Sequence, residues 1–259
     1  MTMSIRKHIP NSLTSLNLFS GCLGIVAVFE DNLPLAALLM AVAIVFDYAD
    51  GMAARLLHAK SDIGLQLDSL SDVVSFGVLP GFIVMKMMEK CSSLPDCAVS
   101  GINLCPFIAL IIPVFSALRL AKFNIDTRQT DSFLGLPTPA NAIFFGSLPL
   151  VIQQCNDNAW TGLAGWLSNW GILTGLTLIF SGLLVSEIPL MSFKFKNLSW
   201  QSNKFRFIFL AIALLVLVFL KFAGIPVAIL LYIMVSLISG KQKSDNGHVS
   251  PVIKAGGKN

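Results

Sequence analysis

Apolar residues fill long stretches of the chain, and polar residues gather in short segments between them. A helix that crosses a membrane needs roughly 20 mostly apolar residues. By this criterion the pattern predicts an all-α polytopic membrane bundle with about eight transmembrane helices, at residues 11–29, 34–57, 62–88, 101–124, 137–154, 167–189, 205–220 and 224–239. Six spans is the alternative count, because the sixth stretch and the last pair are the least constrained.

The same pattern divides the chain into four parts. Residues 1–10 are basic and predict an N-terminal interfacial segment, and residues 11–196 form the core of the protein. Residues 197–240 carry a C-terminal helix pair, which residues 221–224 join in a tight hairpin. Residues 241–259 are polar and rich in Gly, Lys and Ser, which predicts a disordered tail.

Composition supports a membrane protein and excludes several other classes. The chain is 55% hydrophobic and 12% charged, whereas soluble domains are about 45–50% apolar and about 25% charged. This composition excludes a disordered chain and a nucleic-acid binder with a basic surface. All but three of the 18 basic residues fall on one side of the predicted bundle, the exceptions being Lys86, Lys90 and Lys221. The positive-inside rule therefore predicts that both termini lie in the cytoplasm.

The five cysteines form no CxxC pair, and the three histidines are scattered, so a zinc site is not expected. Cys91 and Cys97 fall in the predicted outer loop between the third and fourth spans. A disulfide between them and two free thiols are both compatible with that position.

Four carboxylates occupy positions where a membrane helix normally excludes charge. Asp47 and Asp50 lie at i and i+3 in the second predicted helix, and Asp68 and Asp72 lie at i and i+4 in the third. Each pair therefore shares one helix face. The loop between the helices is short, so the pairs are expected to face each other near the cytoplasmic surface. Charges inside a span are costly and usually mark a functional site.

Small residues and one arginine accompany these carboxylates. Gly51, Ala54 and Gly64 extend the two acidic faces, and Arg55 adds a guanidinium suited to phosphate. Four like charges converge when divalent cations with oxygen ligands bind them. The residues thus predict a metal-dependent site for a phosphorylated substrate. The alternatives are ordinary helix-end carboxylates near water, and a cation transporter or channel lined by the aspartates.

The spacing of these residues resembles the signature of the CDP-alcohol phosphotransferase family, in the string Asp47-x2-Asp50-Gly51-x2-Ala54-Arg55-x8-Gly64-x3-Asp68-x3-Asp72. Members are integral membrane enzymes that transfer a substituted phosphate from a CDP-linked donor to an alcohol and release CMP. Segments that begin at Ile9, Asp68, Arg119, Phe133 and Ser186 are similar to one branch, the membrane-type CDP-diacylglycerol–serine O-phosphatidyltransferases.

The resemblance implies a role for each residue of the site. Asp47, Asp50, Asp68 and Asp72 would bind two divalent ions, Mg²⁺ or Mn²⁺, and Asp72 would also take the proton from the incoming hydroxyl group. The nucleotide and its phosphates would contact Gly51, Ala54, Arg55, Gly64, Asn11 and Thr14. Arg119 and Lys122 are candidates for the serine carboxylate or the lipid phosphate. Lys122 fits equally well as a positive-inside anchor, and Glu187 either pairs with a basic residue or reaches water.

The resemblance also implies the partners and the location. The expected substrates are CDP-diacylglycerol and L-serine, and the expected assembly is a homodimer in the inner or plasma membrane of a prokaryotic-type cell, with the site on the cytoplasmic side. Within the same family, the alternative acceptors are glycerol phosphate, inositol phosphate and choline.

Overall fold

The computed structural model describes residues 2–59, 61–126, 133–190 and 200–246. Most of the described residues are helical. The elements from the N-terminus are α1 (Thr2–Phe29), α2 (Leu33–Leu56), α3 (Asp62–Asp72), the π-helical turn η1 (Val73–Val78), α4 (Leu79–Glu89), β1 (Ala98–Val99), β2 (Ile102–Asn103), the 3₁₀ helix η2 (Cys105–Leu110), α5 (Ile111–Ile125), β3 (Phe133–Leu134), α6 (Thr138–Asp157), α7 (Thr161–Leu167), α8 (Trp170–Val185), β4 (Pro189–Leu190), α9 (Trp200–Leu220), the 3₁₀ turn η3 (Lys221–Ala223) and α10 (Gly224–Asn246).

The predicted all-α membrane bundle is confirmed. In the described residues, five stretches are long and apolar enough to cross a membrane: His8–Phe29, Leu33–Leu56, Asp62–Glu89, Cys105–Ile125 and Phe207–Leu237. The bent pair α7 and α8, with 59° between its helices, makes a sixth if it counts as one span. Helix α6 occupies the fifth predicted range but is not among these stretches.

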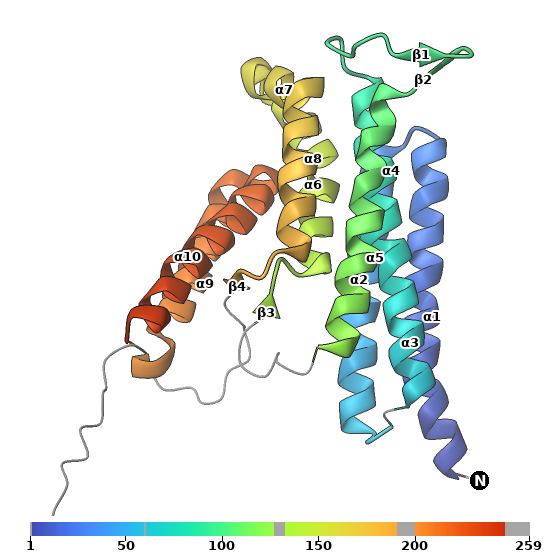
Figure 1. The fold of residues 1–259 in the computed structure, drawn as a ribbon, viewed down its shortest axis with the longest axis vertical. Coiled ribbons are helices and arrows are strands. Elements are labelled where there is room, and N and C mark those ends of the chain that lie inside the picture. The colour runs from blue at the N-terminus through green and yellow to red at the C-terminus, as the bar shows by residue number, and fades with distance from the viewer. Residues whose placement is uncertain (1, 60, 127–132, 191–199, 247–259) are drawn as a thin grey trace, which may run out of the picture.

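The predicted hairpin at residues 221–224 is present within the last stretch. Lys221 has a φ of 51°, and a Cβ on Gly224 would lie 2.7 Å from the carbonyl oxygen of Val216. The chain therefore reverses here, and α9 and α10 lie side by side (Figure 1). Helix α10 continues to Asn246, beyond the predicted start of the tail at residue 241, and residues 247–259 lie outside the described residues.

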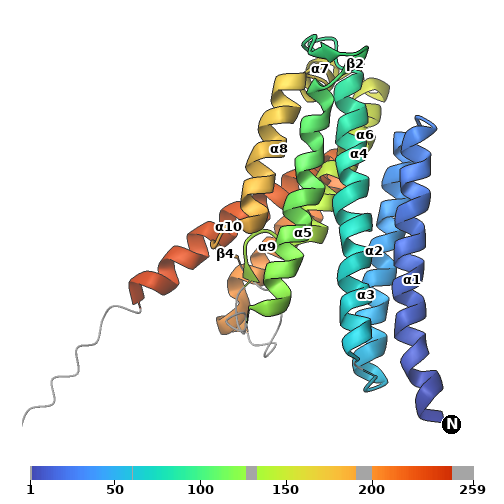
Figure 2. The ribbon, with the colours of Figure 1, turned by 45° about the vertical axis from the view of Figure 1, so that its right-hand side comes forward.

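The N-terminal helix continues across the expected division at residue 10. Helix α1 runs without a break from Thr2 through Pro10 to Phe29, so the predicted interfacial segment and the first span are one helix. Helix α1 packs along both α2 and α3, and the three helices lie side by side in both ribbon views (Figures 1 and 2).

Capping residues place the ends of α2 and α3. Asn32 Oδ1 accepts a hydrogen bond from the Leu35 amide at 3.1 Å, and Pro34 occupies the first turn of α2. Ser61 Oγ accepts one from the Gly64 amide at 3.1 Å and begins α3. Only residues 57–61 separate the two helices, so the end of α2 and the start of α3 meet at one end of the bundle.

Close helix packing forms the core around η1 and α4. Phe76, Phe145 and Phe180 are fully buried there, and the Phe180 ring stacks on Phe144 with centroids 4.0 Å apart. Helix α5 approaches η1 closely because Gly77 has no side chain, and a Cβ there would lie 3.0 Å from Ser116 Cβ.

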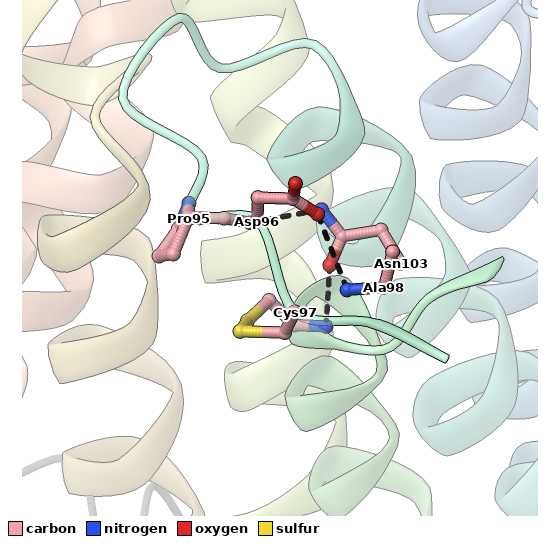
Figure 3. The surroundings of a disulfide bond; sticks show 6 residues. Pro95, Asp96, Cys97, Ala98 and Asn103 are labelled. Atoms are coloured by element: carbon pink, nitrogen blue, oxygen red, sulfur yellow. Dashed lines mark hydrogen bonds between the residues drawn. A yellow bond between two sulfur atoms is a disulfide. The ribbon is translucent and has the colours of Figure 1, made fainter. Parts of the chain in front are cut away.

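A disulfide closes the hairpin at the end of the bundle opposite the N-terminus. Cys97 is bonded to Cys105, while Cys91 is a buried free thiol, so a Cys91–Cys97 bond is excluded. The hydropathy pattern does not predict this disulfide, because it begins the fourth span at residue 101 and so places Cys105 inside the membrane helix. In the structure β1 and β2 pair across residues 98–103, and the helix begins only at Cys105. Asn103 stabilises the loop by donating from Nδ2 to the Pro95 carbonyl at 2.8 Å (Figure 3).

A second short strand pair fixes the start of α6. Strands β3 and β4 pair antiparallel, with Phe133 opposite Leu190. Gly135 follows with a φ of 76°, and a Cβ there would lie 2.6 Å from the Leu184 carbonyl oxygen, so the position requires glycine. The Leu136 amide then donates to the Leu183 carbonyl at 2.9 Å. These contacts anchor the first turn of α6 at the end of α8.

Candidate active site

Three carboxylates from two helices converge near the turn between α2 and α3. One oxygen each from Asp47, Asp50 and Asp68 lie within 4.8 Å of one another. Asp47 and Asp68 are half-buried, and Asp50 is 5% exposed. The helical spacing that pairs Asp47 with Asp50, and the short loop to α3, therefore bring these side chains together as predicted.

Asp72 lies one turn further along α3 and deeper in the bundle. It is 8% exposed and lies outside the group of three, but the charges of Asp47 and Asp68 act on it. Its Oδ1 accepts a hydrogen bond from Nδ2 of Asn17 on α1, at 3.4 Å. The π-helical turn η1 begins at the next residue, and single π-helical turns occur frequently at functional sites.

The carboxylates fit a divalent cation. None of the three ion pairs among the described side chains involves them, and Asp50 Oδ2 is buried without a hydrogen-bond partner. Clustered carboxylates with no cationic partner are costly in a buried place. Hard cations such as Mg²⁺ bind carboxylate oxygens, so this part of the structure can hold such an ion.

A cavity of about 550 Å³ adjoins the carboxylates, between residues 10–14 of α1 and the facing ends of α2 and α3. It is lined by every residue that the family resemblance assigns to nucleotide or phosphate, together with two of the aspartates: Asn11, Thr14, Asp50, Gly51, Ala54, Arg55, Gly64 and Asp68. The residues expected to bind one ligand therefore border one cavity. Their role in binding that ligand stays a prediction.

Two glycines leave space in this cavity in different ways. A Cβ on Gly51 would meet no atom within 4 Å, so this glycine borders open space. A Cβ on Gly64 would lie 3.0 Å from both Asn11 Oδ1 and Ser61 Oγ. A larger residue at position 51 would therefore reduce the cavity without a clash, while one at position 64 would displace its neighbours.

Arg119 and Lys122 lie three residues apart on α5 in different environments. Arg119 is 9% exposed, donates from Nη1 to Thr138 Oγ1 at 3.0 Å, and lies over the Phe123 ring at 5.2 Å. Its charge interacts with that of Asp72, although it does not line the 550 Å³ cavity. Lys122 is half-exposed and pairs with Glu187 at 3.4 Å, so Glu187 has a basic partner.

Asn17 contacts the acidic site, although the sequence pattern does not predict it as a site residue. It is fully buried and contacts Asp72. The available signal is the helix face that Asn17 shares with Thr14, Gly21 and Gly24, a polar and small stripe in an apolar stretch. In the structure Gly21 and Gly24 pack against Ser75 and Leu79.

Comparison with known proteins agrees with the geometry. Residues 7–180 match the family model described as CDP-alcohol phosphatidyltransferase. A protein of Helicobacter pylori (strain J99), named CDP-diacylglycerol–serine O-phosphatidyltransferase, is 29% identical over 245 residues, covering 91% of this chain and 96% of its own length. Proteins with the same name from Bacillus subtilis (36% identical, 59% of this chain and 78% of the relative) and Methanocaldococcus jannaschii (39%, 54% and 60%) are also similar.

Proposed function

The chain belongs to the CDP-alcohol phosphatidyltransferase family, and on this premise we propose that it transfers the phosphatidyl group of CDP-diacylglycerol to L-serine and releases CMP. A relative named for this reaction covers 91% of the chain. The observation that supports the proposal most strongly is the position of three carboxylate oxygens, which lie within 4.8 Å of one another beside a cavity lined by Arg55. Metal ligands and a guanidinium side by side suit a pyrophosphate, because divalent ions and arginine both bind phosphate oxygens.

The donor would bind in the cavity between α1, α2 and α3. Asp47, Asp50, Asp68 and Asp72 are the proposed ligands of two Mg²⁺ or Mn²⁺ ions, which would supply charge neutralisation at the pyrophosphate. Gly51, Ala54 and Gly64 would leave room for the cytidine, and Arg55 would contact a phosphate. Asn11 and Thr14 would add polar contacts from α1, since both line the cavity.

The acceptor would react on the Asp72 side of the carboxylate cluster. Asp72 would take the proton from the serine hydroxyl while the serine oxygen forms a bond to the phosphorus that carries the lipid. The bond from that phosphorus to the CMP oxygen would break, and CMP would leave. Arg119 would hold the serine carboxylate in an orientation that favours this attack. The basic residues of α5 fit a small acceptor with one anionic group. The Lys122 charge is already paired with Glu187, whereas the ion pairs of the described residues do not include Arg119, which is hydrogen-bonded to Thr138.

We propose that the site and both termini face the cytoplasm of a cell whose inner or plasma membrane holds the protein. The turn between α2 and α3 and the N-terminus lie at one end of the bundle, and the Cys97–Cys105 hairpin lies at the other (Figure 1). Disulfides persist in oxidising compartments outside the cytoplasm, which supports the same orientation as the distribution of basic residues. A homodimer, expected from the family, is the proposed assembly.

The test is an acceptor assay with the purified protein in mixed micelles. Labelled serine, glycerol phosphate, inositol phosphate and choline are each supplied with CDP-diacylglycerol, and lipid product and CMP are measured. The proposal predicts equal amounts of phosphatidylserine and CMP with serine. Product with another alcohol but none with serine would contradict the proposed acceptor, and cation flux in liposomes without CMP release would indicate a transporter.

A further inference from the structure

Asn17 combines complete burial with an incompletely satisfied side chain. It lies in the middle of α1 with none of its surface exposed. Its Nδ2 donates to Asp72 Oδ1, at 3.4 Å, and its Oδ1 has no hydrogen-bond partner. A buried amide oxygen without a partner costs about 1–3 kcal/mol, and an apolar residue of similar size would avoid this cost. Packing alone therefore does not account for an asparagine here.

Two backbone contacts hold Asn17 in register with Asp72. Ser71 Oγ donates to the Thr14 carbonyl and Ser75 Oγ donates to the Asn17 carbonyl, each at 3.1 Å. The serines are adjacent to Asp72 and three residues beyond it, so they tie α1 to the segment that presents this carboxylate. Because both are fully buried, water does not compete for these bonds, and the Asn17 amide is held toward Asp72.

We propose that Asn17 is a positioning residue for Asp72. This inference rests on the proposed function, in which Asp72 takes the proton from the acceptor hydroxyl. The Asn17 amide holds one oxygen of the Asp72 carboxylate and fixes the plane of that group, so that the second oxygen is presented to the hydroxyl. Asn17 does not touch the donor, because it does not line the 550 Å³ cavity. Its contribution therefore falls on the rate of reaction and not on nucleotide binding.

The test replaces Asn17 by leucine, which keeps similar bulk and removes the amide. We expect kcat to fall by about 10–100-fold, because misplacing a reacting group by 1 Å costs up to about 100-fold. We expect KM for CDP-diacylglycerol and the Kd of CMP to change less than twofold. The temperature of unfolding should stay close to that of the wild type, because the lost hydrogen bond to Asp72 and the removed unpaired amide oxygen act in opposite directions. A structural role would instead lower stability and activity together.

Ser147→Ala on α6 is the matched control, because it removes a buried side-chain hydrogen bond, from Ser147 Oγ to the Phe144 carbonyl at 2.8 Å, that involves neither Asn17 nor Asp72. The Ser147→Ala variant should keep kcat within about threefold of the wild type. If Asn17→Leu does not fold, Asn17→Ala is measured in the same way. A folded Asn17 variant with kcat within threefold of the wild type would overturn the proposal, as would equal losses of kcat in the Asn17 and Ser147 variants. If the wild type uses an alcohol other than serine, the proposed acceptor is wrong, and the comparison of variants is made with that alcohol.

Discussion

Replacing Thr138 by valine tests the acceptor side of the site. Thr138 is fully buried at the start of α6, and its hydroxyl oxygen accepts the hydrogen bond that Arg119 Nη1 donates at 3.0 Å. Valine keeps the shape and removes the acceptor. Because Arg119 is 9% exposed, water does not replace the lost bond, and a buried guanidinium N–H is left unpaired.

The size of the effect follows from the kind of bond that is lost. Hydrogen bonds to charged groups contribute about 1.5–3 kcal/mol in soluble proteins. Hydrogen bonds between membrane helices average about 0.6 and reach about 1.7 kcal/mol. The two ranges meet near about 1.5 kcal/mol, which corresponds to about a tenfold change in an equilibrium constant. We therefore expect the Thr138→Val variant to unfold more easily by about this amount. The same free energy sets an upper limit of about tenfold on the rise in KM for serine, because serine binding must then order a guanidinium that Thr138 no longer holds.

The assay measures the initial rate of CMP release against serine concentration at saturating CDP-diacylglycerol. The control is Thr177→Val on α8, a threonine that is equally buried but whose hydroxyl oxygen has no partner. This control should leave KM for serine unchanged. A Thr138→Val variant with KM for serine within twofold of the wild type would refute the role given to Arg119, and so would the same increase in both variants.

Three further predictions concern the metal ligands, the cavity and the orientation. Asp68→Asn should lose more than about 100-fold in turnover while its unfolding temperature without metal stays equal or rises, since one of several like charges is removed; retained turnover would contradict the metal role. Gly51→Leu should abolish CMP binding measured by calorimetry, because the side chain enters open space in the cavity, whereas Gly182→Leu, at an equally open glycine on α8, should bind CMP normally. If the hairpin lies outside the cytoplasm, treating intact cells with a membrane-impermeant reductant should open the Cys97–Cys105 disulfide, and an impermeant maleimide should then label both thiols. Labelling that appears only after lysis would place the hairpin in the cytoplasm.

The acidic cluster was predictable because it depends on local geometry. Asp47 and Asp50 lie on one face of a helix by spacing alone, and a short turn leads to the helix that carries Asp68. Their convergence within 4.8 Å needs little beyond helical periodicity and an antiparallel connection. The same reasoning identifies the cavity residues Gly51 and Arg55, because they continue the α2 segment next to the aspartates.

Contacts between distant segments were not predictable in the same way. The Arg119–Thr138 hydrogen bond depends on a strand pair between residues 133–134 and 189–190 and on the positive φ of Gly135. No periodic pattern in the sequence encodes such a pairing, so Arg119 was a candidate without a partner. The contact of Asn17 with Asp72 likewise depends on how α1 packs against α3 and η1, since the two residues are 55 positions apart.

The central claim is that the acidic cluster binds divalent ions that the transfer reaction requires. The most direct measurement is serine-dependent CMP release from CDP-diacylglycerol by the purified wild type, before EDTA treatment, after it, and after Mg²⁺ or Mn²⁺ is restored. We expect EDTA to abolish CMP release and the added ion to restore it. CMP release at an undiminished rate after exhaustive removal of divalent ions would contradict the account.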